Sequence, residues 1–142
     1  MADVAPLLLA DTSAWHRSST PWVEQRWRRY LHRDRIATIP PVKLEVLFSA
    51  RSARDYDVTA GRLAALRQLR CGDDAWARAL EVQRSLAHRH ALHHRSVKMP
   101  DLLVAAVAEL EGAVVWHYDE DFDRIAEVTG QPMAWVAPRG SL

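Results

Sequence analysis

The sequence predicts an α/β protein in which a small parallel sheet lies between two layers of helices, a three-layer α/β/α sandwich. Its strand-like segments are short and almost continuously apolar, which is typical of parallel strands buried on both faces. Helical segments separate these strands, as crossover connections between parallel strands require. With 142 residues and no Pro-, Gly- or Ser-rich linker, residues 1–142 are expected to form a single domain.

In the first half of the chain, prolines and short apolar runs define the expected elements. Pro21 and Pro41 each suit the first turn of a helix, where a missing N–H costs little. Apolar residues recur at helical spacing after Pro21, and positions 42–48 are mostly apolar, so the second of these helices is expected to be largely buried. The expected elements are a strand at Val4–Ala10 ending in a turn, a helix at Pro21–His32, a strand at Ile36–Ile39, and helices at Pro41–Arg51 and Arg54–Leu69.

In the second half, glycines mark the ends of two helices. Gly112 and Gly130 each follow a helical pattern, and glycine tolerates the left-handed backbone that commonly ends a helix. The expected elements are helices at Asp73–His90 and Met99–Leu110, a strand at Ala113–His117, a helix at Asp119–Thr129 and a last strand at Met133–Val136.

Composition excludes several classes of protein. Nineteen Lys and Arg against eighteen Asp and Glu give a net charge of +1, which provides no general attraction to nucleic acid or membrane. Cys71 is the single cysteine, so an internal disulfide and a cysteine zinc site are excluded, and a reducing cytoplasm is expected. The longest apolar helical stretch is far too short to span a bilayer. The sequence therefore predicts a soluble, cytoplasmic protein without a membrane segment.

Carboxylates occur where a parallel sheet usually binds ligands. Asp11 follows the first strand and Asp119 follows the strand at 113–117, and the carboxyl ends of parallel strands share one edge of the sheet. Each aspartate could instead cap the helix that follows it. Glu45 and Asp101 lie in strongly apolar helical segments, where a carboxylate needs a partner, although the helix dipole alone could stabilise Asp101. A hard divalent cation such as Mg²⁺ or Mn²⁺ would relieve repulsion among these groups.

Four segments carrying these carboxylates together resemble the PIN domain, in the order and spacing of the VapC-type ribonuclease toxins of VapBC toxin–antitoxin systems. The segments are Leu8–Trp15, Pro41–Leu47, Met99–Ala106 and His117–Ala126. Each is weakly specific by itself, whereas four in this order form a strong signal. The resemblance extends from Leu7 to Val136.

The resemblance implies a metal-dependent endoribonuclease that cleaves RNA with a metal-activated water, leaving a 5′-phosphate and a 3′-hydroxyl. A hydroxyl of Thr12 or Ser13 would hydrogen bond to a carboxylate ligand or to a water at the metal. Asp123 is an alternative to Asp121 as the additional or water-mediated ligand. The catalytic and metal-binding residues implied are Asp11, Glu45, Asp101 and Asp119, with Asp121 as an additional metal ligand, and the cofactor is Mg²⁺, for which Mn²⁺ could substitute.

The resemblance also implies an RNA substrate, a VapB-type antitoxin partner and a homodimer formed through helical surfaces. The antitoxin's C-terminal segment would cover the acidic site and could place an Arg among its carboxylates. One alternative is a non-catalytic RNA- or partner-binding PIN module. Another is a phosphatase of the haloacid dehalogenase type, but that chemistry needs an acid two residues after Asp11, where Ser13 stands.

Two further features have a functional and a structural interpretation. The segment 88–94 is rich in histidine, and His90 and His94 could share a helix face suited to Zn²⁺. A basic segment that contacts RNA phosphates or the antitoxin, or a solvated helix end, accounts for it better. Trp22 and Trp27 alternate with arginines and could stack on bases, although their spacing favours a core or dimer-interface face.

Overall fold

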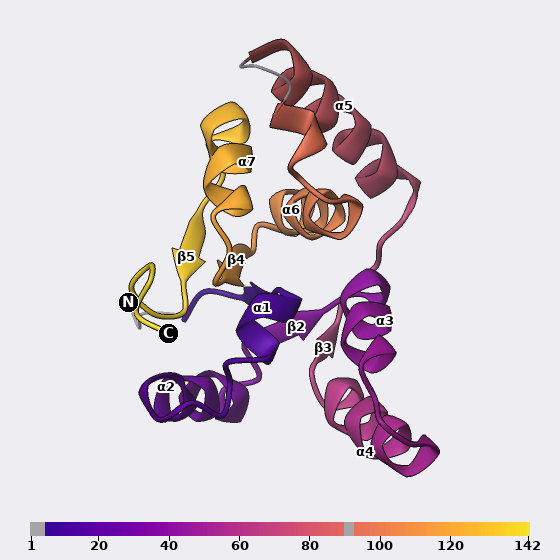
Figure 1. The fold of residues 1–142 in the computed structure, drawn as a ribbon, viewed down its shortest axis with the longest axis vertical. Helices are drawn as coiled ribbons and strands as arrows, with labels where there is room; N and C mark the ends of the chain where they lie inside the picture. The colour runs from indigo at the N-terminus through magenta and orange to yellow at the C-terminus, as the bar shows by residue number, and fades with distance from the viewer. Residues whose placement is uncertain (1–4, 90–92) are drawn as a thin grey trace.

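A computed structural model describes residues 5–89 and 93–142 of the chain (Figure 1). Its five strands form one parallel sheet in the order β3-β2-β1-β4-β5. The strands are β1 (Leu8–Ala10), β2 (Ile36–Thr38), β3 (Arg67–Gln68), β4 (Val114–His117) and β5 (Met133–Trp135). The helices in the described residues are α1 (Thr12–Trp15), α2 (Pro21–His32), α3 (Pro40–Phe48), α4 (Ala53–Ala64), α5 (Asp73–Arg89), α6 (Met99–Glu111) and α7 (Asp121–Thr129), with a short 3₁₀ helix, η1 (His93–Arg95).

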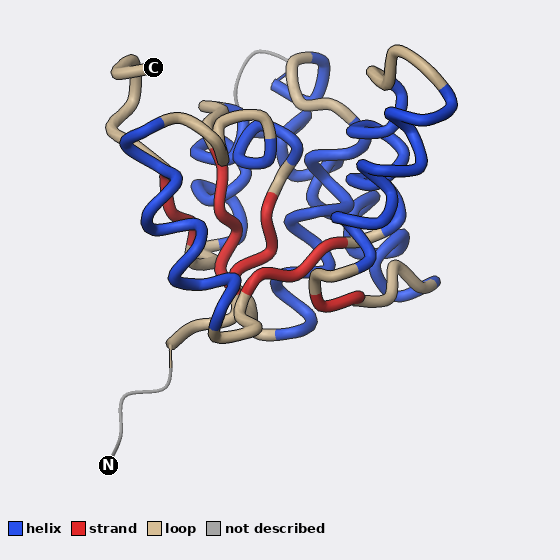
Figure 2. Tube along the Cα trace, turned by 90° about the horizontal axis from the view of Figure 1, so that it is seen from below, coloured by secondary structure: helices blue, strands red, loops and turns tan. Residues whose placement is uncertain are grey.

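The order of the strands places helices on both faces of the sheet. The chain first moves outward from the central strand β1 to β2 and β3, and then returns to β4 and β5 on the other side of β1. Because parallel crossovers are right-handed, these opposite directions put α2 and α4 on one face and α5, α6 and α7 on the other (Figure 1). The strands lie between these helical layers in Figure 1, and Figure 2 shows them along their length. The predicted three-layer α/β/α architecture with a parallel sheet is confirmed.

The core is built from the central strands and α6. All three residues of β1 and of β2 are buried, and α6 is buried continuously from Asp101 to Ala108. On the α2 side, Trp27 stacks on Trp116 of β4 with 5.5 Å between ring centres and 14° between planes. Trp22, by contrast, is 59% exposed, so only part of the tryptophan face predicted for this helix belongs to the core.

Several predicted element boundaries were wrong. The helix predicted to reach Leu69 ends at Ala64, and residues 67–68 add the edge strand β3. The Gln68 side-chain amide donates to the carbonyl oxygen of Leu63 in the last turn of that helix and to that of Leu66 just beyond it. The turn expected after the first strand is the short helix α1, and η1 was not predicted. Val4 and His90, at the ends of two predicted elements, lie outside the described residues.

The prediction that the helix after Pro41 is largely buried was also wrong. Helix α3 begins at Pro40 and ends at Phe48 rather than at Arg51. Only one side of it packs inward, through Val42 and Val46, whereas Leu44 is 69% and Phe48 is 92% exposed. A helix with apolar residues on two faces has the same sequence pattern whether other elements cover one face or both.

No helix within the described ranges has the length and apolar character needed to cross a bilayer.

Candidate metal-binding active site

The candidate site lies between β1 and β4, where the crossovers on the two sides of the sheet run in opposite directions. These two strands pair in register from Leu8 opposite Val114 to Ala10 opposite Trp116, so their carboxyl ends lie side by side. Asp11 directly follows β1, and Asp119 follows β4 by two residues. Ligands bind open α/β sheets at such a switch point because the crossovers on the two sides diverge there and leave space.

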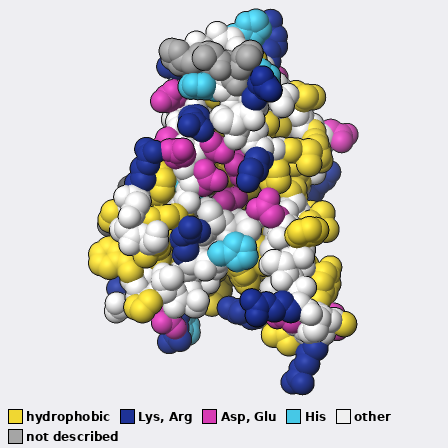
Figure 3. Space-filling model, viewed as in Figure 1, with side chains coloured by type: hydrophobic (Ala, Val, Ile, Leu, Met, Phe, Trp, Pro, Cys, Tyr) yellow, Lys and Arg dark blue, Asp and Glu magenta, His cyan; other side chains and the backbone are white. Residues whose placement is uncertain are grey.

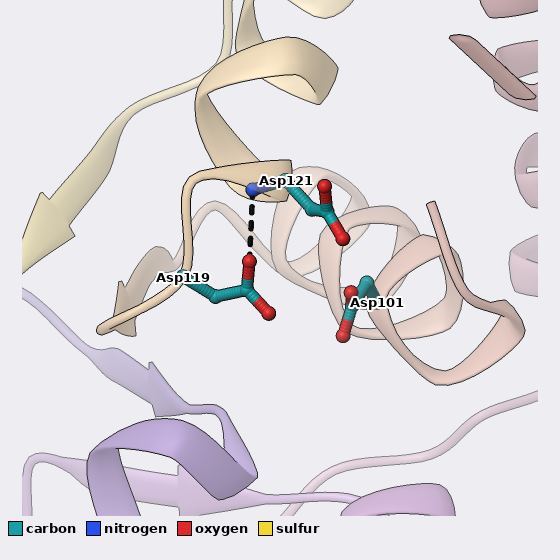
Figure 4. A group of neighbouring side chains, drawn as sticks. All are labelled: Asp101, Asp119 and Asp121. Atoms are coloured by element: carbon teal, nitrogen blue, oxygen red, sulfur yellow. Dashed lines mark hydrogen bonds between the residues drawn. The ribbon is translucent and has the colours of Figure 1, made fainter. Parts of the chain in front are cut away.

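Three carboxylates, those of Asp101, Asp119 and Asp121, meet at this edge and form the acidic cluster. Asp101 lies in the first turn of α6, and Asp119 and Asp121 come from the turn after β4 and the start of α7. One carboxylate oxygen of each lies within 4.8 Å of the others (Figure 4). The backbone N–H of Asp121 donates to Oδ1 of Asp119 at 2.9 Å, which holds the turn in place.

Asp11 and Glu45 lie close enough to act on the same cluster electrostatically. Burial, and then the negative charges of Asp11, Asp119, Asp121 and Glu45, raise the pKa of Asp101 to about 8. The pKa of Asp11 is also raised, mainly by burial and further by Glu45, although hydrogen bonds from Ser13 oppose the shift. The other four carboxylates singled out from the sequence therefore all act on Asp101 at this edge of the sheet.

Ser13 connects the two strand ends that carry the site. Its Oγ donates to Oδ2 of Asp11 at 2.6 Å and accepts from the backbone N–H of Tyr118 at 2.9 Å. Its own backbone N–H also donates to Oδ2 of Asp11, which makes Asp11 the N-cap of α1. The capping and site interpretations of Asp11 are thus compatible, because the cap uses one carboxylate oxygen and leaves Oδ1 free of the cap.

The structure distinguishes Asp121 from Asp123. Asp121 is buried in the acidic cluster, and its Oδ1 accepts from Arg124 at 2.6 Å. Burial and the charge of Asp119 raise the pKa of Asp121, while Arg124 opposes that shift. Asp123 instead accepts a hydrogen bond from the indole Nε1–H of Trp135 at 3.2 Å, and it is not part of the cluster.

The donor set suits a hard divalent cation. Asp11 Oδ1 and Asp101 Oδ2 are both buried and have no hydrogen-bond partner among the described residues. A buried carboxylate oxygen without a partner is costly, and an ion coordinated by oxygens would satisfy both atoms. Within the described residues, the acidic cluster is the one group of three or more potential ligands close enough to share a metal. Of the suggested zinc pair, His90 lies outside those residues.

Sequence reasoning missed His117 as a residue of this site. Its ring is fully buried between Phe122 and Trp135, each with ring centres 4.9 Å away. Nδ1 accepts from the backbone N–H of Asp119 at 3.2 Å, and burial lowers the pKa of His117 to about 4 although Asp123 and Asp119 oppose the shift. The only signal in the sequence was its position at the end of an apolar strand, which is equally typical of a core residue.

An apolar groove of about 380 Å³ adjoins the acidic site. Glu45 is one of its lining residues, so the groove reaches one of the five carboxylates. Several of its apolar side chains are exposed, including Phe48, Met99 at 61% and Trp76 at 46%. The groove is lined by Pro41, Leu44, Glu45, Phe48, Trp76, Met99, Pro100 and Leu103.

Comparison with known proteins identifies a family, sequence relatives and a solved structure of similar fold. Residues 8–128 match the PIN domain family. The chain is 52% identical to Ribonuclease VapC18 of Mycobacterium tuberculosis over 132 residues, covering 93% of this chain and 96% of that protein. It is 42% identical over 134 residues to Ribonuclease VapC21 of the same species, covering 94% and 96% of the two chains.

A solved structure gives the same fold at low sequence identity. The crystal structure of DNA-bound VapBC from Salmonella typhimurium superimposes with a TM-score of 0.74 at 19% identity, covering 94% of this chain and all of that one. This similarity supports the arrangement of sheet and helices, whereas the sequence relatives carry the family assignment. The chain belongs to the PIN domain family, among the VapC ribonucleases.

Proposed function

We propose that this chain is a metal-dependent endoribonuclease, the toxin component of a toxin–antitoxin system. The observation that carries the proposal is the convergence of five carboxylates at the switch point, two of them with buried oxygens that have no partner in the described part of the chain. The relatives' names support RNA as the substrate, because VapC18 and VapC21 are both ribonucleases.

In this proposal, Asp11, Glu45, Asp101 and Asp119 hold Mg²⁺, or Mn²⁺ in its place, and Asp121 is an additional ligand. A divalent ion bound there supplies an activated water and stabilises negative charge on the scissile phosphate and the leaving 3′ oxygen. The chain's residues fix the donors: Ser13 orients the Asp11 carboxylate, and the backbone of Asp121 orients that of Asp119. No ribose 2′-hydroxyl is required as nucleophile, so the products carry a 5′-phosphate and a 3′-hydroxyl.

The test is the pair of variants Asp11→Asn and Asp123→Asn. Asparagine at position 11 can still cap α1, but it removes the charge that a cation requires. We expect Asp11→Asn to lose both growth inhibition on induced expression and Mg²⁺-dependent cleavage of RNA. We expect a loss of at least about a hundredfold, measured by initial rates and by mapping the 5′ ends of cleaved RNA.

Asp123→Asn is the matched control, because Asp123 is two residues from Asp121 and bonds Trp135 instead of joining the cluster. It should retain cleavage close to that of the unsubstituted chain. Cleavage by Asp11→Asn at an undiminished rate would overturn the metal mechanism. A chain that binds RNA but never cleaves it would favour the non-catalytic PIN module.

We also propose a VapB-type antitoxin as partner and a homodimer of this chain. The apolar groove beside Glu45 offers a surface for a partner's apolar side chains, and the neighbouring carboxylates would attract an inserted Arg. The structurally similar protein from Salmonella typhimurium was crystallised as DNA-bound VapBC, which supports a partner of this kind. A structure of this chain with its antitoxin in which the acidic site stays open and metal-filled would contradict the insertion.

A further inference from the structure

Arg17 is held beside the acidic site by residues that also frame Asp11. Its Nη1 donates to the backbone carbonyl of Ser13 at 3.0 Å, and its Cζ lies 4.2 Å from the centre of the Tyr118 ring. Ser13 in turn bonds both the Asp11 carboxylate and the backbone of Tyr118. The guanidinium is therefore fixed relative to Asp11 through two contacts.

The aromatic ring beneath Arg17 is itself held in position. The edge of Trp135 packs against Tyr118 with ring centres 5.4 Å apart and planes at 83°. The backbone N–H of Leu142 donates to the Tyr118 hydroxyl at 2.8 Å. Fixing the ring in this way reduces the conformational entropy that a ligand would otherwise have to remove on binding.

The charge of Arg17 is not neutralised by a carboxylate. Arg28, Arg78 and Arg124 each pair with an acidic side chain, but none of the ion pairs found in the described part of the chain includes Arg17. The side chain is half-buried, with one side over Tyr118. Figure 3 shows that acidic side chains gather in the middle of this face with Lys and Arg around them. Among the described residues, Arg17 is a cation fixed by Ser13 and Tyr118 without a carboxylate partner, which suits it to an anionic ligand.

We propose that the guanidinium of Arg17 is a stacking platform for an unpaired RNA base beside the scissile phosphate, extending the column formed by Tyr118 and Arg17. The inference rests on the proposed ribonuclease function and assigns Arg17 a role in positioning its RNA substrate. Unpaired bases stack on arginine planes and aromatic rings, whereas bases within an A-form duplex are already stacked and inaccessible. A guanidinium sandwiched between a tyrosine and a base gains cation–π attraction on both faces.

The experiment distinguishes the effect of the planar guanidinium of Arg17 from the effect of its positive charge. Arg17→Lys keeps the positive charge but removes the planar group, and Arg28→Lys makes the same change on α2, where Arg28 is exposed and pairs with Glu24. For each variant of the full chain, RNA affinity and fluorescence quenching are measured with a short single-stranded RNA that contains 2-aminopurine. The fluorescence of this base falls when it stacks. An Asp101→Asn background prevents cleavage during the binding measurement.

We expect Arg17→Lys to weaken binding of the single-stranded RNA about tenfold and to abolish the fluorescence quenching, because one stacked base contributes on the order of a tenfold effect or more. With Asp101 intact, KM should rise by the same factor while kcat changes little. Arg28→Lys should match the parent in both assays. Binding of a duplex RNA of the same sequence should not respond to Arg17→Lys.

Equal affinity and equal quenching for Arg17→Lys and the parent would overturn the stacking proposal. A merely structural effect of Arg17 would lower the melting temperature without changing the quenching of bound RNA, and that result also overturns it. Failure of the proposed function gives a different result, since the unsubstituted chain would then cleave no RNA with Mg²⁺ present.

Discussion

At the residue scale, Asp101 combines burial with the repulsion of neighbouring carboxylates. It is buried in the first turn of α6 and is surrounded by four other carboxylates, so its ionised form is disfavoured and its pKa rises to about 8. The helix dipole explains why an aspartate is tolerated at the start of α6, but it does not explain burial against like charges. Without a cation, the ionised carboxylate therefore lowers the stability of the fold.

Asp101→Asn should stabilise the metal-free protein at pH 8 while destroying its metal response. An amide avoids the cost of ionising a buried group, and the gain should exceed about 2 kcal/mol in the free energy of unfolding. Urea denaturation in EDTA measures this gain, and a thermal shift with Mg²⁺ should then be lost. Asp123→Asn serves as the comparison and should change neither quantity much. A less stable Asp101→Asn at pH 8 would contradict the repulsion argument.

At the element scale, helix ends marked by a glycine were easier to predict than helix faces. Helix α6 is capped by Gly112, whose φ of 66° is in the left-handed region, as its place after an apolar helical run predicted. Helix α3 shows the opposite case, because its apolar positions predicted burial but Leu44 and Phe48 face outward. A helix end depends on local backbone preference, whereas the burial of a face depends on what other elements cover it.

Replacing two glycines by alanine should give effects of opposite sign. Gly112→Ala forces a Cβ into a left-handed backbone and should cost about 1–2 kcal/mol, although nothing lies within 4 Å of the added atom. Gly61→Ala, inside α4 and equally unobstructed, should gain about 0.5–1 kcal/mol. Chemical denaturation of the two variants checks both values. If both changes had the same sign, backbone conformation could not be the cause.

At the scale of the whole molecule, the reversal of the sheet at β1 assembles the site from segments far apart in the chain. Asp11, Glu45, Asp101 and Asp119 come from four different elements or turns and become coupled only because β4 returns beside β1. The net charge of +1 does not reveal that these carboxylates are gathered in one place. Carboxylates neutralised by metal in one site would leave the remaining surface with an excess of Lys and Arg.

The stability of the metal-free protein should fall as pH rises from about 6.5 to about 8. The unfolded chain ionises Asp101 near pH 3.8, while the folded chain retains that proton up to about pH 8, so stability is lost as pH rises through this range. His117 has the opposite effect, since its pKa is lowered from 6.5 to about 4 and its contribution is lost as pH falls between those values. Of these two effects, only the loss of stability from ionising Asp101 continues above pH 6.5.

Thermal melting in EDTA across this range measures the fall, and saturating Mg²⁺ should reduce or reverse it, because cation binding favours ionised carboxylates. A melting temperature that rises between pH 6.5 and 8 in EDTA would contradict the shifted pKa of Asp101.

The sequence by itself determined the fold class, the positions of most helices and strands, and the carboxylates that the structure brings together. These depend on local periodicity, on capping and turn residues, and on acidic residues placed after strands. Tertiary structure alone decided that Asp121 rather than Asp123 joins the cluster, that His117 supports Asp119, and that Arg17 lies over Tyr118. It also decided the edge strand β3 and the exposed face of α3. Each of these depends on which distant segment lies opposite a residue, and short-range sequence patterns carry no information about that neighbour.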